Sequence, residues 1–222
     1  MKKIAFTILS LVLMMPSMAQ TNFGSFFDRG IYYGLRLGLS LPTINSDEEL
    51  LDGSSSKAGL CLGAVIGMQL SNTSPVYLES GLYYIEKGGK GYHYHQVAAG
   101  SNNSNNKVNK KFTYDLNYLE IPIVVKYKAE IADDLTVQPF GGGYFALGIG
   151  GKIKNHEDKE TSPSFSSDGF QRFDGGLRIG CGIEYQLIYA EAAYEWGLTN
   201  ISHSDFESSH NNCFYLNLGV NF

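Results

Sequence analysis

Residues 173–185 read Phe-Asp-Gly-Gly-Leu-Arg-Ile-Gly-Cys-Gly-Ile-Glu-Tyr and alternate between two kinds of side chain. The odd-numbered positions are apolar or glycine, and the even-numbered positions are charged or glycine. Successive side chains of a β-strand point to opposite faces of a sheet, so this period of two residues predicts a strand with one apolar and one polar face. A fold built from such strands must place the two faces in different surroundings.

The same alternation recurs along the chain after residue 30. We predict eight strands, at residues 31–41, 58–70, 76–87, 113–128, 135–148, 171–185, 188–197 and 212–222. Three connections are short turns, at residues 71–75, 129–134 and 186–187, and four are long polar loops, at residues 42–57, 88–112, 149–170 and 198–211. Short turns at one end and long loops at the other are typical of outer-membrane barrels. The pattern predicts an all-β fold, an eight-stranded antiparallel up-and-down (meander) transmembrane β-barrel with a filled lumen.

The location of each face follows from the residue types on it. Alternation alone fits a soluble, lipocalin-like barrel equally well. Glycine is frequent on the polar face, however, and glycine weakens a solvated strand while it suits a lumen so narrow that side chains fill it. The polar face is therefore predicted to lie inside and the apolar face to contact lipid. An even number of strands then places both termini on the periplasmic side and the long loops outside the cell.

Charged residues on the polar face are predicted to meet inside the barrel. A buried charge is tolerated when it is paired and hydrogen-bonded, so we expect an ion-pair network that fills the lumen. The alternative is a path for protons or ions, which eight strands leave little room for. The predicted lumen charges are Arg36, Glu79, Glu120, Lys126, Asp174, Arg178, Glu184, Glu191 and Glu195.

Aromatic residues on the apolar face are predicted to form two girdles around an aliphatic band, as rings prefer the headgroup boundary of a bilayer. The girdle at the short-turn end would contain Tyr33, Tyr127, Tyr185 and Phe222, and the girdle at the loop end Tyr84, Phe145, Phe173, Trp196 and Phe214. The terminal Phe222 also resembles the C-terminal aromatic residue that the outer-membrane barrel insertion machinery recognises.

The N-terminus predicts export. Lys2 and Lys3 precede an apolar stretch at residues 4–15, and Ser17-Met18-Ala19 is a small-x-small cleavage site. These features are those of a secretory signal peptide. We therefore predict a signal peptide at residues 1–19, a short periplasmic segment at residues 20–29 and an outer-membrane β-barrel domain at residues 30–222.

Composition and cysteine usage agree with this class of protein. The 222 residues carry 17 Lys+Arg against 22 Asp+Glu, a net charge of −5 with no basic block, so no nucleic-acid partner is expected. The chain is 43% hydrophobic, too apolar for disorder, yet lacks the ~20-residue apolar runs of a helical membrane protein. Strand parity points Cys61 and Cys213 inward and Cys181 outward, as small packing residues rather than a disulfide framework.

No motif predicts a catalytic residue, a metal site or a cofactor. His93-Tyr94-His95 has the spacing of two metal ligands but no nearby third ligand, and the acidic stretch Asp47-Glu48-Glu49 lacks an EF-hand pattern. No GxSxG motif is present. One alternative stays open: a Ser/His/acid set at the outer rim, with His203 or His210, would indicate a lipid-modifying enzyme.

The stretch Asn117-Tyr118-Leu119-Glu120-Ile121-Pro122-Ile123-Val124-Val125-Lys126-Tyr127 resembles the PorT-like outer-membrane β-barrel family of Bacteroidetes-type bacteria. Residues 173–185, 191–201 and 214–222 resemble the same family. The resemblance implies an eight-stranded outer-membrane barrel with no established enzymatic residues. The founding member of that family is linked to a protein-secretion system.

Three functions follow as expectations for this cell-envelope protein. The first is a non-enzymatic outer-membrane barrel whose surface loops bind a partner or serve structurally. The second is a component of a protein-secretion or translocation system. The third is a lipid-modifying enzyme. Expected partners are outer-membrane lipid, the insertion machinery through Phe222, and an envelope or secretion-system protein.

Overall fold

A computed structural model describes residues 30–46, 56–71, 73–95, 108–155, 161–165, 170–202 and 208–222. The predicted signal peptide at residues 1–19 and the segment at residues 20–29 lie outside the described residues. Among the described residues, no helix is long and apolar enough to cross a membrane.

The described residues form ten strands, of which eight build the barrel wall. They are β1 (Ile31–Ser46), β2 (Gly59–Ser71), β3 (Ser74–His95), β4 (Val108–Tyr127), β5 (Ala129–Ala132), β6 (Leu135–Asn155), β7 (Thr161–Pro163), β8 (Phe173–Tyr185), β9 (Ile188–Gly197) and β10 (Ser209–Asn221). The short β5 continues β4 after Lys128 and pairs with the start of β6, while β7 pairs with the far end of β6. The wall therefore consists of β1, β2, β3, β4 with β5, β6, β8, β9 and β10.

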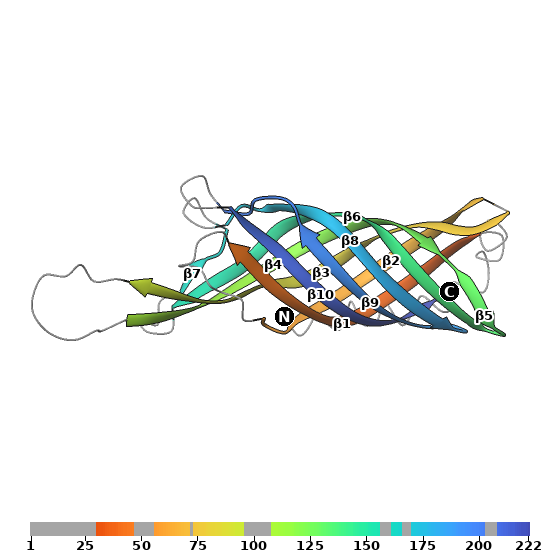
Figure 1. Cartoon of the computed structure of the whole chain (residues 1–222), viewed down its shortest axis with the longest axis horizontal. Helices are drawn as coiled ribbons and strands as arrows, with labels where there is room; N and C mark the ends of the chain where they lie inside the picture. The colour runs from red at the N-terminus through yellow and green to blue at the C-terminus, as the bar shows by residue number, and fades with distance from the viewer. Residues whose placement is uncertain are drawn as a thin grey trace, which may run out of the picture.

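The sheet closes on itself, because β1 pairs antiparallel with β2 on one side and with β10 on the other. The remaining neighbours in the wall follow one another along the chain (Figure 1). At the seam, the backbones of Tyr33 and Phe222 exchange two hydrogen bonds of 2.8 Å. This topology confirms the predicted eight-stranded antiparallel meander barrel. Closure leaves the wall with no edge whose backbone groups would be unpaired in lipid.

Four strands extend well beyond their predicted bounds. β1 extends to Ser46, β3 extends to His95, β4 begins at Val108 and β6 reaches Asn155, so the predicted loops at residues 42–57, 88–112 and 149–170 were too long. The β3–β4 hairpin projects well beyond the barrel wall (Figure 1). Both faces of the projecting part lie away from the apolar band, so the alternation of apolar and polar residues that revealed the wall is lost there.

The exterior of the barrel is apolar. Leu37 is 56% exposed, Ile179 52% and Leu218 66%, and many other large aliphatic side chains point outward in the same way. An apolar surface that surrounds a molecule is incompatible with water, since soluble monomers expose only small apolar patches. The free thiol of Cys181 is exposed on this surface, whereas those of Cys61 and Cys213 are buried in the lumen, as strand parity predicts.

Aromatic rings inside the lumen explain its glycines. A Cβ added to Gly63 would lie 2.4 Å from the ring of Tyr83, and one added to Gly67 would lie 2.1 Å from the ring of Tyr32. The ring of Phe140 covers Gly180 in the same way, at 2.4 Å. Inward rings thus need a glycine on a neighbouring strand, because eight strands enclose too little space for two side chains at these positions.

We predict that an arginine on the outer face prevents assembly. Leu37→Arg or Ile179→Arg should cost about 2–4 kcal/mol near the middle of the bilayer, because the charge would lie in hydrocarbon. The folded fraction after refolding into lipid vesicles, read from heat-modifiable migration on a gel, measures this. Leu37→Ile is the matched control and should fold like the parent; normal insertion of Leu37→Arg would contradict the assigned face.

A second prediction compares two glycines. Gly63→Ala should destabilise the barrel by about 1–3 kcal/mol, because the added methyl group overlaps Tyr83. At the outward-facing Gly141 the nearest heavy atom to an added Cβ lies 4.0 Å away, so Gly141→Ala should be close to neutral. Urea unfolding in vesicles gives both free energies. An equal decrease in the free energy of unfolding for the two variants would contradict steric filling of the lumen.

Candidate functional site

The structure brings the charged residues on the polar face together inside the barrel. Eight of the nine residues proposed from the sequence are at most 5% exposed: Arg36, Glu79, Glu120, Lys126, Asp174, Arg178, Glu191 and Glu195. The ninth, Glu184, lies near the short-turn end with its side chain 17% exposed. The lumen charges form two groups, one near the short-turn end and one nearer the loop end.

Glu79 on β3 is the centre of the group near the short-turn end. Its Oε2 atom accepts hydrogen bonds from Lys126 Nζ at 2.8 Å and from the Tyr32 hydroxyl at 2.5 Å. Arg36 Nη2 lies 3.8 Å from the same oxygen, and its guanidinium lies 4.0 Å from the centre of the Tyr189 ring. Residues from β1, β3 and β4 thus meet at one carboxylate, and Lys126 also donates a hydrogen bond of 2.9 Å to the Tyr189 hydroxyl on β9, across the lumen.

Glu184 closes the same end of the lumen. Its Oε2 atom accepts hydrogen bonds from Gln138 at 2.9 Å and from Asn221, and Lys128 Nζ lies 3.6 Å away. The Lys128 ammonium also lies 4.1 Å from the centre of the Tyr32 ring. Lys128 lies between β4 and β5, and its side chain points inward to contact Glu184 and Tyr32.

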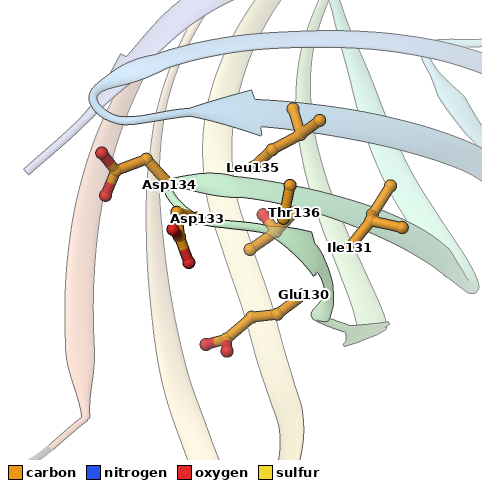
Figure 2. Close-up of a pocket in the computed structure, with 7 residues that line it drawn as sticks. Glu130, Ile131, Asp133, Asp134, Leu135 and Thr136 are labelled. Carbon is orange, nitrogen blue, oxygen red and sulfur yellow. The ribbon is translucent and has the colours of Figure 1, made fainter.

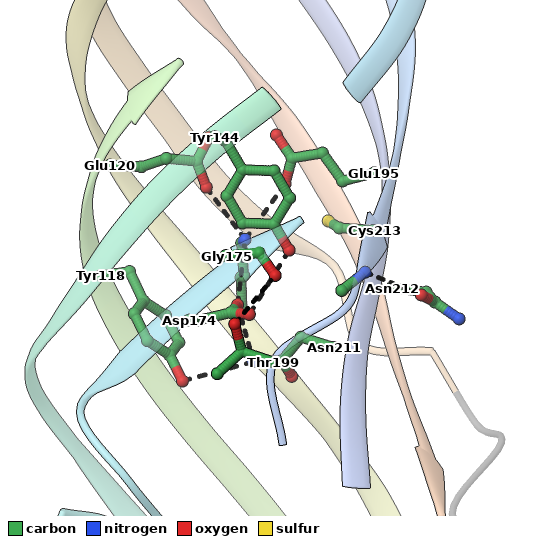
Figure 3. A network of polar contacts seen from close by, with 12 residues as sticks. Tyr118, Glu120, Tyr144, Asp174, Gly175, Glu195, Thr199, Asn211, Asn212 and Cys213 are labelled. Atoms are coloured by element: carbon green, nitrogen blue, oxygen red, sulfur yellow. Dashed lines mark hydrogen bonds and ion pairs between the residues drawn. The ribbon is translucent and has the colours of Figure 1, made fainter. Parts of the chain in front are cut away.

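Lys87, which is not among the lumen charges predicted from the sequence, is the centre of the second group. Its Nζ atom lies 2.9 Å from Glu120, 3.0 Å from Glu195 and 3.4 Å from Asp174, and all four side chains are fully buried. Figure 3 shows these three carboxylates converging from different strands. The Tyr144 ring lies under the ammonium, with its centre 4.2 Å away. Strand parity would have identified Lys87, because it shares the inward face of β3 with Glu79, but it lies at the last position of the predicted strand.

Arg178 on β8 joins the carboxylates around Lys87 to a further one. Its Nη1 atom lies 3.1 Å from Glu195 and 3.4 Å from Glu120, and its Nη2 atom lies 3.2 Å from Glu191. The planar guanidinium carries several N–H donors in fixed directions, so it can bind several carboxylates at once with defined geometry, whereas an ammonium acts as a point charge. β4, β8 and β9 are therefore tied together across the lumen.

Neutral donors complete the network. In the described part of the lumen, six carboxylates face the five cations Arg36, Lys87, Lys126, Lys128 and Arg178. Hydroxyl and amide groups supply further donors: Tyr215 donates to Glu195 at 2.7 Å, Tyr189 to Glu191 at 3.0 Å, Asn217 to Glu191 at 2.9 Å and Asn211 to Asp174 at 3.2 Å. The arrangement fits a structural network, since every carboxylate has donors from neighbouring strands.

An apolar cluster covers the charged lumen at the loop end. It is formed by Leu116, Tyr118, Tyr144, Ala146 and Ile201, with Ile44, Phe165 and Phe170 packed against it. The Phe165 ring contacts the Tyr118 ring edge-on, with centres 5.5 Å apart, and lies over Gly148. Phe165 and Phe170 both come from the segment between β6 and β8, and their side chains cover the mouth of the barrel.

A pocket in the described residues lies away from the charged lumen. It is an open depression at the β5–β6 turn, lined by residues 130–136 (Figure 2). Its whole lining comes from a single hairpin, with Glu130, Asp133 and Asp134 at its rim. A ligand site needs convergent groups from several elements, which this depression does not have.

The aromatic residues proposed for the two girdles all lie on the outer face of the barrel. Most are well exposed: Tyr127, Phe145, Phe173, Tyr185, Trp196 and Phe222 are between 37% and 55% exposed. Tyr33, Tyr84 and Phe214 are half-buried on the same face. Phe145 and Phe173 are neighbours, with ring centres 6.5 Å apart.

Histidine and serine residues at the loop end were the candidates for catalysis. The side chains of His93 and His95, and the whole of His203, lie outside the described residues. His210 Nε2 lies 3.2 Å from the Ser208 hydroxyl, but its Nδ1 lies 3.1 Å from the carbonyl oxygen of Thr199, where a catalytic triad would have a carboxylate. Within the described ranges, no group of three or more His, Cys, Asp and Glu residues is arranged to hold a metal ion.

Comparison with known proteins agrees with this architecture. The family model described as "Outer membrane protein beta-barrel domain" matches residues 18–203. Among solved structures, the chain is similar to Ail, the attachment invasion locus protein of Yersinia pestis, at 12% identity and a TM-score of 0.42, covering 86% of this chain and 98% of that chain. No curated protein matches the sequence.

Two further solved structures are similar to the chain at the same level. Neisserial surface protein A is 13% identical, with a TM-score of 0.44, and the match covers 87% of this chain and 97% of that chain. A major outer membrane protein from Thermus thermophilus is also 13% identical, with a TM-score of 0.49, covering 86% of this chain and 99% of that chain.

We predict that Lys87 holds the network together. Lys87→Met should lower the free energy of unfolding by about 3–5 kcal/mol, because it leaves buried carboxylates without their cation. Adding Glu120→Gln should recover part of the loss, because it removes one of those charges. Urea unfolding in vesicles of the two single variants and the double variant gives the coupling energy.

Glu130→Met, on the exposed β5–β6 turn and outside the lumen network, is the control and should change stability by less than about 0.5 kcal/mol. Equal stabilities of Lys87→Met and Glu130→Met would show that the lumen contacts do not support the barrel.

Proposed function

Because the chain belongs to the family of outer membrane β-barrel domains, we propose that its mature form, residues 20–222, is a non-enzymatic structural protein of the outer membrane. In this proposal residues 1–19 are removed on export, residues 20–29 form a short periplasmic segment and residues 30–222 form the membrane domain. No cofactor or metal is needed, and the loops at the far end of the barrel are free to contact a partner.

The filled lumen is the observation that carries the proposal. Two groups of ion pairs, centred on Glu79 and Lys87, occupy successive levels of the barrel, and an apolar cluster that includes Phe165 covers the loop end. An eight-stranded barrel encloses space only for its own side chains, so such a lumen does not act as a channel. A filled barrel is suited to hold loops rigidly at the cell surface.

The orientation follows the usual arrangement of such barrels. Both termini and the short turns would face the periplasm, and the long loops would face the outside. The β3–β4 hairpin then projects furthest from the membrane and is the first surface that an external partner would meet (Figure 1). The terminal Phe222, 37% exposed beside Tyr33 at the seam, would be the residue that the insertion machinery reads.

Conductance measurements test this proposal. The purified mature protein in planar lipid bilayers should give no stepwise current above the lipid background, because the lumen charges and the apolar cluster occupy the path. Heat-modifiable migration of the same sample shows that the barrel is folded. Reproducible channel steps from folded protein would contradict the proposal and favour an ion path through the lumen.

The resemblance of residues 117–127 to PorT-like barrels of Bacteroidetes-type bacteria favours a second candidate, a role in protein secretion. In this case the loops or the periplasmic turns would contact other secretion components. Deletion of the gene should then retain cargo proteins in the periplasm, whereas a purely structural barrel would leave secretion unchanged. Crosslinking and pull-down from intact cells would identify the partner in either case.

A further inference from the structure

Lysines gather on the outer face of the barrel just above its apolar band at the loop end. Asp115 on β4 is the centre of this group: Lys154 Nζ on β6 lies 3.0 Å from one carboxylate oxygen, and Lys57 Nζ, from the segment before β2, contacts the other. Lys57 reaches this position from across β3. One carboxylate therefore holds two ammonium groups from separate parts of the chain side by side.

The strand register adds two further lysines to the same face. Lys152 on β6 is the pairing partner of Asp115, and Lys154 and Lys90 are the partners of Thr113 on its two sides. Residues paired directly across neighbouring strands point to the same side of a sheet. Lys57, Lys90, Lys152 and Lys154 thus form one group, which we term the lysine cluster.

The charges in the lysine cluster are not cancelled. Asp115 is its only internal carboxylate among the described residues, and the nearby Glu86 is bound to the Leu60 backbone at 3.2 Å and the Tyr84 hydroxyl at 3.3 Å. The Asp115 carboxyl lies above the apolar band, where partial burial alone would raise its pKa. Hydrogen bonds from Lys57 and Lys154 outweigh this effect and hold the pKa of Asp115 below its usual range. Asp115 therefore stays ionised and positions the lysines, while the group as a whole remains positive.

The part of the lysine cluster around Asp115 and Lys152 lies at the depth of lipid headgroups. Ile149, 50% exposed, is the last apolar side chain of β6 on the outer face, and Lys152 follows it three positions later. Three residues advance a strand by about 10 Å, or about 7 Å in height at a tilt of about 45°. The headgroup layer on each side of a bilayer is about 5–8 Å thick. The Lys152 ammonium is thus placed where lipid phosphates lie.

At the short-turn border of the apolar band, the exposed charged residues that the structure describes are acidic rather than basic. The β5–β6 turn presents Glu130, Asp133 and Asp134, all exposed. Lys128, the nearest lysine, is turned into the lumen toward Glu184 and does not face the headgroups. The two borders of the band therefore offer different charges to the two leaflets, with ammonium groups concentrated at the loop end.

We propose that the lysine cluster binds the phosphate groups of lipids in the leaflet at the loop end. The ligand class is a phosphate-bearing lipid whose acyl chains lie against the apolar band while its phosphates lie among Lys57, Lys90, Lys152 and Lys154. The contacts are charge-assisted hydrogen bonds from ammonium groups to phosphate oxygens. This inference rests on the proposed membrane orientation, in which the loop end faces the outer leaflet.

Native mass spectrometry of the mature protein in zwitterionic detergent, titrated with lipid A, tests the proposal. Lipid A carries phosphates on a glycolipid and is compared with its dephosphorylated form and with inorganic phosphate. The quadruple variant Lys57→Gln/Lys90→Gln/Lys152→Gln/Lys154→Gln should bind lipid A at least about tenfold more weakly, since a lysine near a charged membrane surface contributes about fivefold. The parent should prefer lipid A to the dephosphorylated form by a similar factor.

The matched control replaces the same four lysines by arginine, which keeps the charge and should keep the affinity. Heat-modifiable migration of every variant shows separately whether the barrel forms. A folded parent that binds both glycolipids equally, or a folded glutamine variant that retains lipid A, would overturn this inference and leave the proposed function standing. Inorganic phosphate bound as tightly as lipid A would overturn the assignment to lipid headgroups. A parent that forms no barrel in lipid would instead overturn the proposed function.

Discussion

Backbone hydrogen bonding in hydrocarbon is the constraint on which the rest of this structure depends. Lipid offers no partner for a backbone N–H or C=O group, so a sheet that crosses a membrane must close on itself. Here the pairing of β1 with β10 completes that closure. Closing eight strands encloses a lumen so narrow that several inward rings lie over a glycine of a neighbouring strand, as Tyr83 lies over Gly63.

The narrow lumen also determines how the charged side chains inside it must be paired. Charged side chains that point inward lose their contact with water and can be accommodated only through partners from other strands. Lys87 and Arg178 each bind three carboxylates, and Glu79 receives donors from two other strands, β1 and β4. These contacts connect segments far apart in sequence and tie the walls of the barrel together. The loop end, closed by a cluster containing Phe165, is thereby held on a rigid support.

The fold could be predicted from the sequence because the membrane imposes a period of two on every spanning strand. Residues 173–185 display both faces, and the same pattern located each of the eight wall strands. The extended parts of β3, β4 and β6 were missed because both of their faces lie beyond the apolar band. Lys87 was missed because it lies at the end of a predicted strand, and its three carboxylate partners, on β4, β8 and β9, become neighbours only when the barrel closes.

In this structure the apolar face contacts hydrocarbon while the polar face is enclosed in the lumen. Cys181 offers a direct test, since its thiol is exposed on the outer face whereas Cys61 and Cys213 are buried. A fluorescent label attached to Cys181 in a Cys61→Ala/Cys213→Ala protein, then refolded into vesicles, can be probed with brominated lipids and with aqueous iodide. We expect quenching by bromine on the acyl chains and none by iodide. Quenching by iodide alone would show that this face lies in water and not in hydrocarbon.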